Sequence, residues 1–185
     1  MTGRAYVLLS FLLAACGTVQ SHAPTSILCR DSDSVFAEKV EALIAAGVDA
    51  QRAKLAPDAS PLRPDPDLAR IARTRSCNMA HGADFSHTDA QGNFIVGDMV
   101  REIPRRYYGT NGENIGTMQM IGARPLGPED FAQATVQAWM ESPEHRANIL
   151  NPAFNLAGVG VAKVGDEAFV TQVFYGPVRE HKDFN

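Results

Sequence analysis

The segment W-M-E-S-P-E-H-R-A-N-I-L, from Trp139 to Leu150, carries the strongest structural signal in this chain. It follows a helical pattern over residues 128–140, in which one face repeats at i, i+4, i+7 and i+8. The residues on that face are Phe131, Thr135, Ala138 and Trp139. Ser142 is a typical N-cap residue, and Pro143 is typical of the first position of a helix. The segment therefore predicts two successive helices, the second of which fixes the direction of His145.

Shorter motifs lie on both sides of this segment. Upstream are F-S-H at residues 85–87 and G-E-N at residues 112–114. Downstream, residues 156–162 combine valines at 159 and 161 with glycines at 158 and 160, which predicts a buried strand. A second run at residues 168–175 follows a short polar turn, so the two runs predict an antiparallel hairpin.

Taken in this order, the motifs resemble the CAP superfamily: cysteine-rich secretory proteins, antigen 5, plant pathogenesis-related proteins of class 1 and bacterial relatives. The resemblance covers about residues 34–176, and its most specific part is the 139–150 segment followed by the G-V-G-V strand. Helices early in the chain with strands at its end indicate an α+β fold. The resemblance sharpens this to an α–β–α sandwich with a small central antiparallel sheet.

The rest of the chain predicts three helices and the loops between them. An amphipathic helix is expected over residues 34–46 with Gly47 as its stop, and another from Pro66 to about Ala80. Four prolines predict an irregular connection over residues 56–66. A short helix is expected at residues 98–103, and the glycine-rich segments around G-E-N are expected to be loops.

The N-terminus has the pattern of a lipoprotein export signal at residues 1–15. Arg4 precedes a short apolar run, and Leu13-Ala14-Ala15-Cys16 matches a lipoprotein cleavage box. The run is shorter than the roughly 20 residues that span a bilayer. Cleavage before Cys16 would leave 170 residues, with a lipidated Cys16, a tether at 16–33, a CAP domain at 34–176 and a tail at 177–185. We therefore expect an exported protein, anchored through lipid at the periplasmic face or cell surface.

Charge, chain length and cysteine content indicate the binding partners, the number of domains and the disulfides to expect. Loss of Arg4 would change the formal charge from −4 to −5, which gives no electrostatic basis for nucleic-acid binding. A chain of this size buries roughly 70% of its unfolded surface, so a single domain is expected. We also expect the protein to be a monomer. After lipidation of Cys16, Cys29 and Cys77 form an even pair, which predicts one disulfide in an exported protein. The alternative is two buried free thiols.

The resemblance implies a cleft lined by two histidines and two acidic residues. It places His87, Glu113 and His145 at three of these positions, whereas the fourth is Ala134 here. Imidazoles and a carboxylate suit zinc or a similar divalent cation, so His87, His145 and Glu113 are a candidate ligand set. The missing acid weakens both metal binding and any acid–base pair, and a metal-free polar cleft is the alternative. Glu113 is also compatible with a purely structural role in its loop.

The functional hypothesis is an exported, lipid-anchored CAP-domain protein whose cleft binds a small ligand, such as a lipid, or a cell-wall component. A divalent metal is part of this hypothesis, but nothing in the chain requires a turnover reaction. One alternative is a metal-dependent hydrolase or peptidase with His87 and His145 as ligands and Glu113 as a third ligand or general base. The other is a structural envelope protein in which the polar cluster only ties loops to the core.

Overall fold

The computed structural model of the 185-residue chain describes residues 34–104, 109–119 and 126–177. The signal peptide, Cys16, the tether with Cys29 and the tail after Pro177 lie outside the described residues. The elements in chain order are α1 (Ser34–Leu55), β1 (Arg63–Pro64), α2 (Pro66–Ala80), α3 (Ile95–Arg101), β2 (Gly109–Gln119), α4 (Pro128–Glu141), α5 (Pro143–Leu150), β3 (Leu156–Val164) and β4 (Glu167–Pro177). None of the helices in these ranges is long and apolar enough to cross a membrane.

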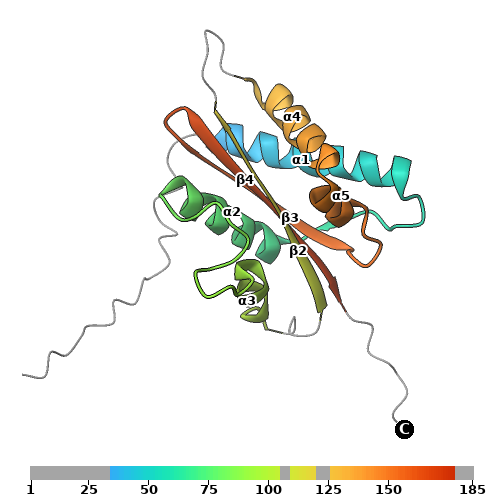
Figure 1. Ribbon diagram of the computed structural model, residues 1–185. Coiled ribbons are helices and arrows are strands. Elements are labelled where there is room, and N and C mark those ends of the chain that lie inside the picture. The colour runs from blue at the N-terminus through green and yellow to red at the C-terminus, as the bar shows by residue number, and fades with distance from the viewer. Residues whose placement is uncertain (1–33, 105–108, 120–125, 178–185) are drawn as a thin grey trace, which may run out of the picture.

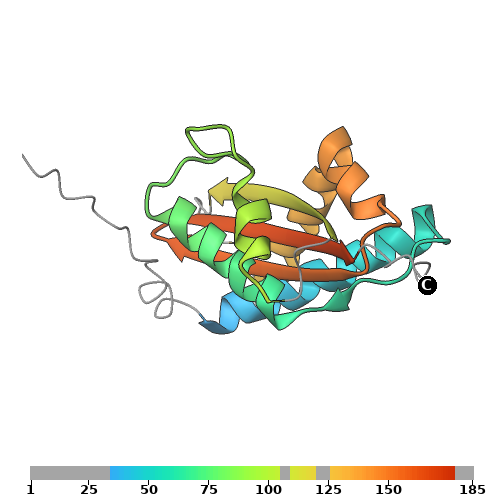
Figure 2. The same ribbon diagram turned by 90° about the horizontal axis from the view of Figure 1, so that it is seen from below.

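The elements form three layers, in which one sheet lies between two layers of helices (Figures 1 and 2). The strand order is β1-β3-β4-β2, with β3–β4 and β4–β2 antiparallel and the short β1 parallel to β3. Helices α2 and α3 cover one face, and α1, α4 and α5 cover the other. This arrangement confirms the predicted α+β sandwich, and β1 adds a short parallel pair to an otherwise antiparallel sheet.

The backbone of α2 lies directly on β3 because β3 has glycines on that face. A Cβ on Gly158 would overlap the backbone at Ala69, and a Cβ on Gly160 would overlap the backbone at Arg73. Ser76 completes this contact, with its Oγ 2.9 Å from the carbonyl oxygen of Gly160. Alternating side chains of a strand point to opposite faces. The G-V-G-V pattern therefore presents its glycines to α2 and its buried valines to α1 on the other face.

Local patterns predicted several elements correctly. The structure confirms the helices at α2, α4 and α5 and the C-terminal hairpin, which turns at Gly165 with φ of +57°. The predicted buried face of α4 was wrong at one residue, because Ala138 is exposed. Ala132 and Val136 are buried beside Phe131 instead. The third helix, α3, begins three residues earlier than predicted, at Ile95.

Two predictions about helix and strand boundaries were wrong. Gly47 does not end α1, which continues to Leu55; Gly47 faces α4, where a Cβ would lie 3.2 Å from Val136 Cγ2. Gly47 therefore allows α1 to pack closely on α4 and does not end the helix. The segment around G-E-N is not a loop but part of β2, which pairs with β4 along its whole length. The strand was not predicted because the segment is polar. Its strand conformation depends on pairing with β4 and on burial by the surrounding helices.

We expect Gly160→Ala to destabilise the fold by about 1–3 kcal/mol or more, because the new methyl group must push α2 away from β3. Urea unfolding followed by circular dichroism measures this change. Gly127→Ala is the matched control, since a Cβ there meets no atom of the described residues nearer than Glu129 Oε2 at 3.8 Å. Equal stability losses in the two variants would contradict the proposed close contact.

Candidate functional site

The site is built at the β2 edge of the sheet, where the G-E-N motif lies on the strand. Successive residues of β2 point to opposite faces, so Glu113 faces the α2 layer and Asn114 faces the α5 layer. Gly112 has no room for a side chain, because a Cβ would lie 2.9 Å from Phe154 Cζ. The motif thus joins two layers of the sandwich at one point of the sheet.

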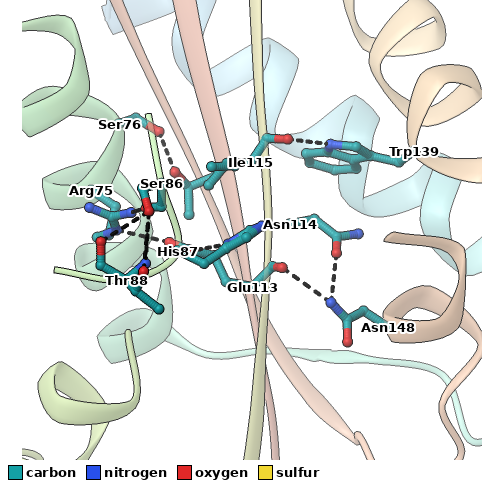
Figure 3. Close-up of polar contacts among 11 residues, drawn as sticks. Arg75, Ser76, Ser86, His87, Thr88, Glu113, Asn114, Ile115, Trp139 and Asn148 are labelled. Carbon is teal, nitrogen blue, oxygen red and sulfur yellow. Dashed lines mark hydrogen bonds and ion pairs between the residues drawn. The ribbon is translucent and has the colours of Figure 1, made fainter. Parts of the chain in front are cut away.

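Hydrogen bonds fix α4 and α5 against this strand (Figure 3). Asn148 Nδ2 donates to the carbonyl oxygen of Glu113 at 3.1 Å and to Asn114 Oδ1 at 2.9 Å. Asn114 Nδ2 donates to the carbonyl oxygen of His145 at 3.1 Å. Trp139 Nε1 donates to the carbonyl oxygen of Ile115 at 3.0 Å. Forming these four bonds requires the 139–150 segment to lie alongside β2, which sets the position of His145.

On the other face, Glu113 forms a buried ion pair with Arg75 of α2. Arg75 Nε donates to Glu113 Oε1 at 2.8 Å, and the exposed fractions of the two side chains are 2% and 0%. The second oxygen, Glu113 Oε2, lies 2.8 Å from His87 Nδ1. Both carboxylate oxygens are therefore engaged, and Glu113 holds the ring of His87 in one orientation. The side chain of His87 is 40% exposed, so the ring lies at the surface of the site.

Arg75 is a site residue that sequence reasoning did not nominate. Besides Glu113, it donates through Nη2 to the carbonyl oxygen of Ser86 at 2.6 Å, and so fixes the F-S-H loop. Its position in the sequence could have indicated this role. Arg75 lies four residues after Ile71 and four before Met79, on the buried stripe of α2. A charged residue on an apolar stripe needs a buried partner.

His87 lies in the loop between α2 and α3, and His145 lies in α5 on the other side of the sheet. Their rings approach each other near β2. Their ring centroids are 6.1 Å apart at an interplanar angle of 69°. His145 also lies edge to face with buried Trp139, at a centroid distance of 6.4 Å. Burial lowers the pKa of His145 from its ordinary 6.5; repulsion between the two rings when both are protonated lowers it further, and Glu144 opposes the shift. Near neutral pH, His145 is therefore an uncharged imidazole.

The structure brings His87, Glu113 and His145 together, as the resemblance implied, but gives Glu113 a different position from that of a metal ligand. Its two oxygens are occupied by Arg75 and His87, and its side chain is inaccessible. Across the described residues, no group of three His, Cys, Asp or Glu side chains is arranged to hold a metal ion. The predicted three-ligand set therefore does not fit. A carboxylate bonded to the second nitrogen of a histidine instead orients that ring.

The other predicted site residues have mixed outcomes. Ala134, at the position of the missing acid, is half-buried in α4. Cys77 is buried in α2, whereas Cys29 lies outside the described residues, so their disulfide stays a prediction. The same holds for lipidation of Cys16. Ser142 occupies the N-cap position of α5, but its side chain makes no capping hydrogen bond.

The fold and the adjacent rings of His87 and His145 are those of a sandwich of the cysteine-rich secretory type. The chain belongs to the CAP family, described as the cysteine-rich secretory protein family, whose pattern matches residues 52–174. It is also similar to the protein YkwD of Bacillus subtilis (strain 168), with 36% identity over 116 residues. That match covers 63% of this chain and 40% of YkwD, so the chain spans less than half the length of this relative.

Solved structures show the same fold at lower identity. An outer surface protein from Borrelia burgdorferi has a TM-score of 0.61 and 15% identity, covering 76% of this chain and 95% of that one. An extracellular SCP-domain protein from Bacillus anthracis str. Ames has a TM-score of 0.54 and 24% identity, covering 76% and 41%. These likenesses establish the fold.

We expect Arg75→Met to lower the free energy of unfolding by about 3–5 kcal/mol, because it leaves the Glu113 carboxylate buried without its cation. Urea unfolding at neutral pH measures this loss. Arg101→Met is the matched control: Arg101 pairs with Asp98 on the surface of α3, and exposed pairs contribute about 0–1 kcal/mol. Similar losses in both variants would contradict a buried, structural role for the Arg75–Glu113 pair.

The lowered pKa of His145 predicts a pH dependence of stability. As the pH falls through the ordinary value of 6.5, the unfolded chain binds a proton that folded His145 resists, so stability falls. Stability should therefore drop between about pH 7.5 and pH 5.5, and His145→Gln should make this drop smaller. Urea unfolding at both pH values tests this. An unchanged pH dependence in His145→Gln would exclude His145 as a contributor.

Proposed function

We propose that this protein is an exported CAP-domain protein, held at the cell envelope by lipid on Cys16, whose His87–His145 cleft binds a small ligand or envelope component without turnover. The observation that carries the proposal is the pairing of an oriented, partly exposed His87 with an uncharged His145 at 6.1 Å. Two such rings offer hydrogen-bonding nitrogens and aromatic edges to one bound group.

The charge of the cleft narrows the ligand class. Arg75 and Glu113 neutralise each other, and His145 is uncharged near neutral pH. A neutral group that bears hydroxyls or amides matches such a surface better than a strongly charged one does. Sugars of the cell wall and polar ends of neutral lipids both present groups of this kind.

The proposed location rests on the sequence and on relatives. Residues 1–16 have the pattern of a lipoprotein signal and its cleavage box. Two proteins with the same fold are described as an outer surface protein and an extracellular protein. Export followed by lipid anchoring is consistent with both observations.

Binding fits the geometry better than hydrolysis does. A general base must reach the proton that it removes, but the Glu113 carboxylate is inaccessible and already bonded at both oxygens. If a divalent cation binds here, His87 and His145 are the groups that would hold it, with Glu113 orienting His87. Such a cation would supply a further attachment point for a ligand oxygen.

The first test uses purified full-length protein with soluble cell-wall fragments and with vesicles of extracted envelope lipid. We expect the wild type to bind one of these, and His87→Ala/His145→Ala to bind at least about tenfold more weakly while remaining folded. His81→Ala is the matched control, because His81 lies at the end of α2 and bonds through Nδ1 to the carbonyl oxygen of Cys77. Equal binding by the double variant would overturn the proposal.

Zinc titration by calorimetry, after chelator treatment, tests the metal separately. A two-histidine site should bind Zn²⁺ more weakly than a closed four-ligand site does, and binding should disappear in His87→Ala/His145→Ala. Binding that persists in this folded double variant would place the metal elsewhere. If the same variant loses stability but keeps its ligand binding, the result would favour the alternative hypothesis of a structural envelope protein.

A further inference from the structure

A hollow lies at the opposite edge of the sheet from His87 and His145. It is a groove of about 470 Å³ between α1 and α2, along the part of β3 where β1 has ended. This volume lies in the range of small-molecule sites, roughly 300–1,000 Å³. The pairing of β1 with β3 stops at Pro64 and Ala157, so the groove opens directly beside the strand.

The inner surface of the groove is mostly apolar. Leu62, Ala157 and Val159 form its base, and Ala42 and Ala46 of α1 form one wall. The two alanines are exposed, so the small side chains leave the groove open to solvent. Such a surface fits the apolar body of a ligand.

One buried polar group in the groove lacks a hydrogen-bond partner within the described part of the chain. Gln172 of β4 forms part of the wall and is 1% exposed. Among the described residues, nothing donates a hydrogen bond to its Oε1 atom. Buried carbonyl oxygens are almost always paired, because an unmade hydrogen bond is costly. A ligand that carries a hydrogen-bond donor would satisfy this oxygen.

The charged groups at the groove are also mainly acceptors. Three carboxylates line it: Glu41, Asp49 and Asp65. The cation among the lining residues is Arg73, whose Nε lies 3.0 and 3.1 Å from the two oxygens of Glu41. Arg73 pairs with Glu41 and Arg52 lies near Asp49, so the three carboxylates outnumber these two arginines by one formal negative charge, which favours a cationic over an anionic ligand.

From these observations we infer that the groove between α1 and α2 is a second binding site, which takes a small, mostly apolar molecule ending in an amine. The apolar body lies against Leu62, Ala157 and Val159, and the ammonium group donates to Gln172 Oε1 or to the carboxylates. Fatty acids and other anionic lipids are disfavoured by the same charges. This site is independent of the His87–His145 cleft, since the two lie at opposite edges of the sheet.

The test uses two fluorescent probes with the same apolar body, dansylcadaverine with an amine end and dansyl-6-aminohexanoate with a carboxylate end. Each is titrated into the full-length protein, and binding is followed by fluorescence anisotropy. We expect the amine probe to bind at least about tenfold more tightly than the carboxylate probe. Absence of binding by the amine probe, or equal binding of the two probes, would overturn the inference.

Variants locate the bound probe. Ala46→Phe places a large side chain in the groove at an exposed position, and should weaken binding of the amine probe at least about tenfold. Ala50→Phe is the matched control, because Ala50 is an exposed alanine of α1 outside the groove. An Ala46→Phe variant that binds like Ala50→Phe would overturn the assignment to this groove.

A further pair of variants separates this site from the cleft and tests the amide. Gln172→Met removes the unpaired acceptor and should reduce the preference for the amine probe; an unchanged preference would exclude Gln172 as its partner. His87→Ala/His145→Ala should leave binding of the amine probe unchanged. Loss of binding in that double variant would place the probe in the histidine cleft instead. Thermal melting checks that every variant is folded, and Ala46→Phe keeps the test decisive if Gln172→Met does not fold.

Discussion

The buried ion pair between Arg75 and Glu113 is the interaction on which the rest of the site depends. It connects α2 to the edge strand β2 and, through the second oxygen of Glu113, fixes the ring of His87. Arg75 also holds the F-S-H loop at the carbonyl oxygen of Ser86. Two charges removed from water must satisfy each other and every remaining polar atom, and this requirement permits few alternative arrangements.

A second buried arginine holds the other half of the site through hydrogen bonds to backbone carbonyl oxygens. Arg52 of α1 is 1% exposed and donates through Nη1 to the carbonyl oxygens of Ile149 and Asn151, at 2.5 and 3.0 Å. These oxygens lie at the C-terminal end of α5, where a cation is favoured. Burial lowers the pKa of Arg52, and the nearby Asp49 opposes that shift. Helix α5, which carries His145, is thus fixed at its end by Arg52 and along its side by Asn114.

Patterns within one element were predicted well, because their cause lies within that element. The helix at α2 begins at a proline after Asp65, whose side chain caps it, and the hairpin turns at a glycine with positive φ. Gly47 and the G-E-N segment were misinterpreted for one reason: both depend on a distant partner. Gly47 packs on Val136, and β2 is defined by its pairing with β4.

By itself, the sequence determined the family, the α+β class and the three residues His87, Glu113 and His145. Only the tertiary structure decided what these residues do. Glu113 changed from a candidate ligand to the group that orients His87, because Arg75 and His87 occupy both of its oxygens. No spacing reveals this, since 38 residues separate Arg75 from Glu113 in the chain. Charge compensation in a buried site depends on which side chains meet in space, and only the packed layers bring these together.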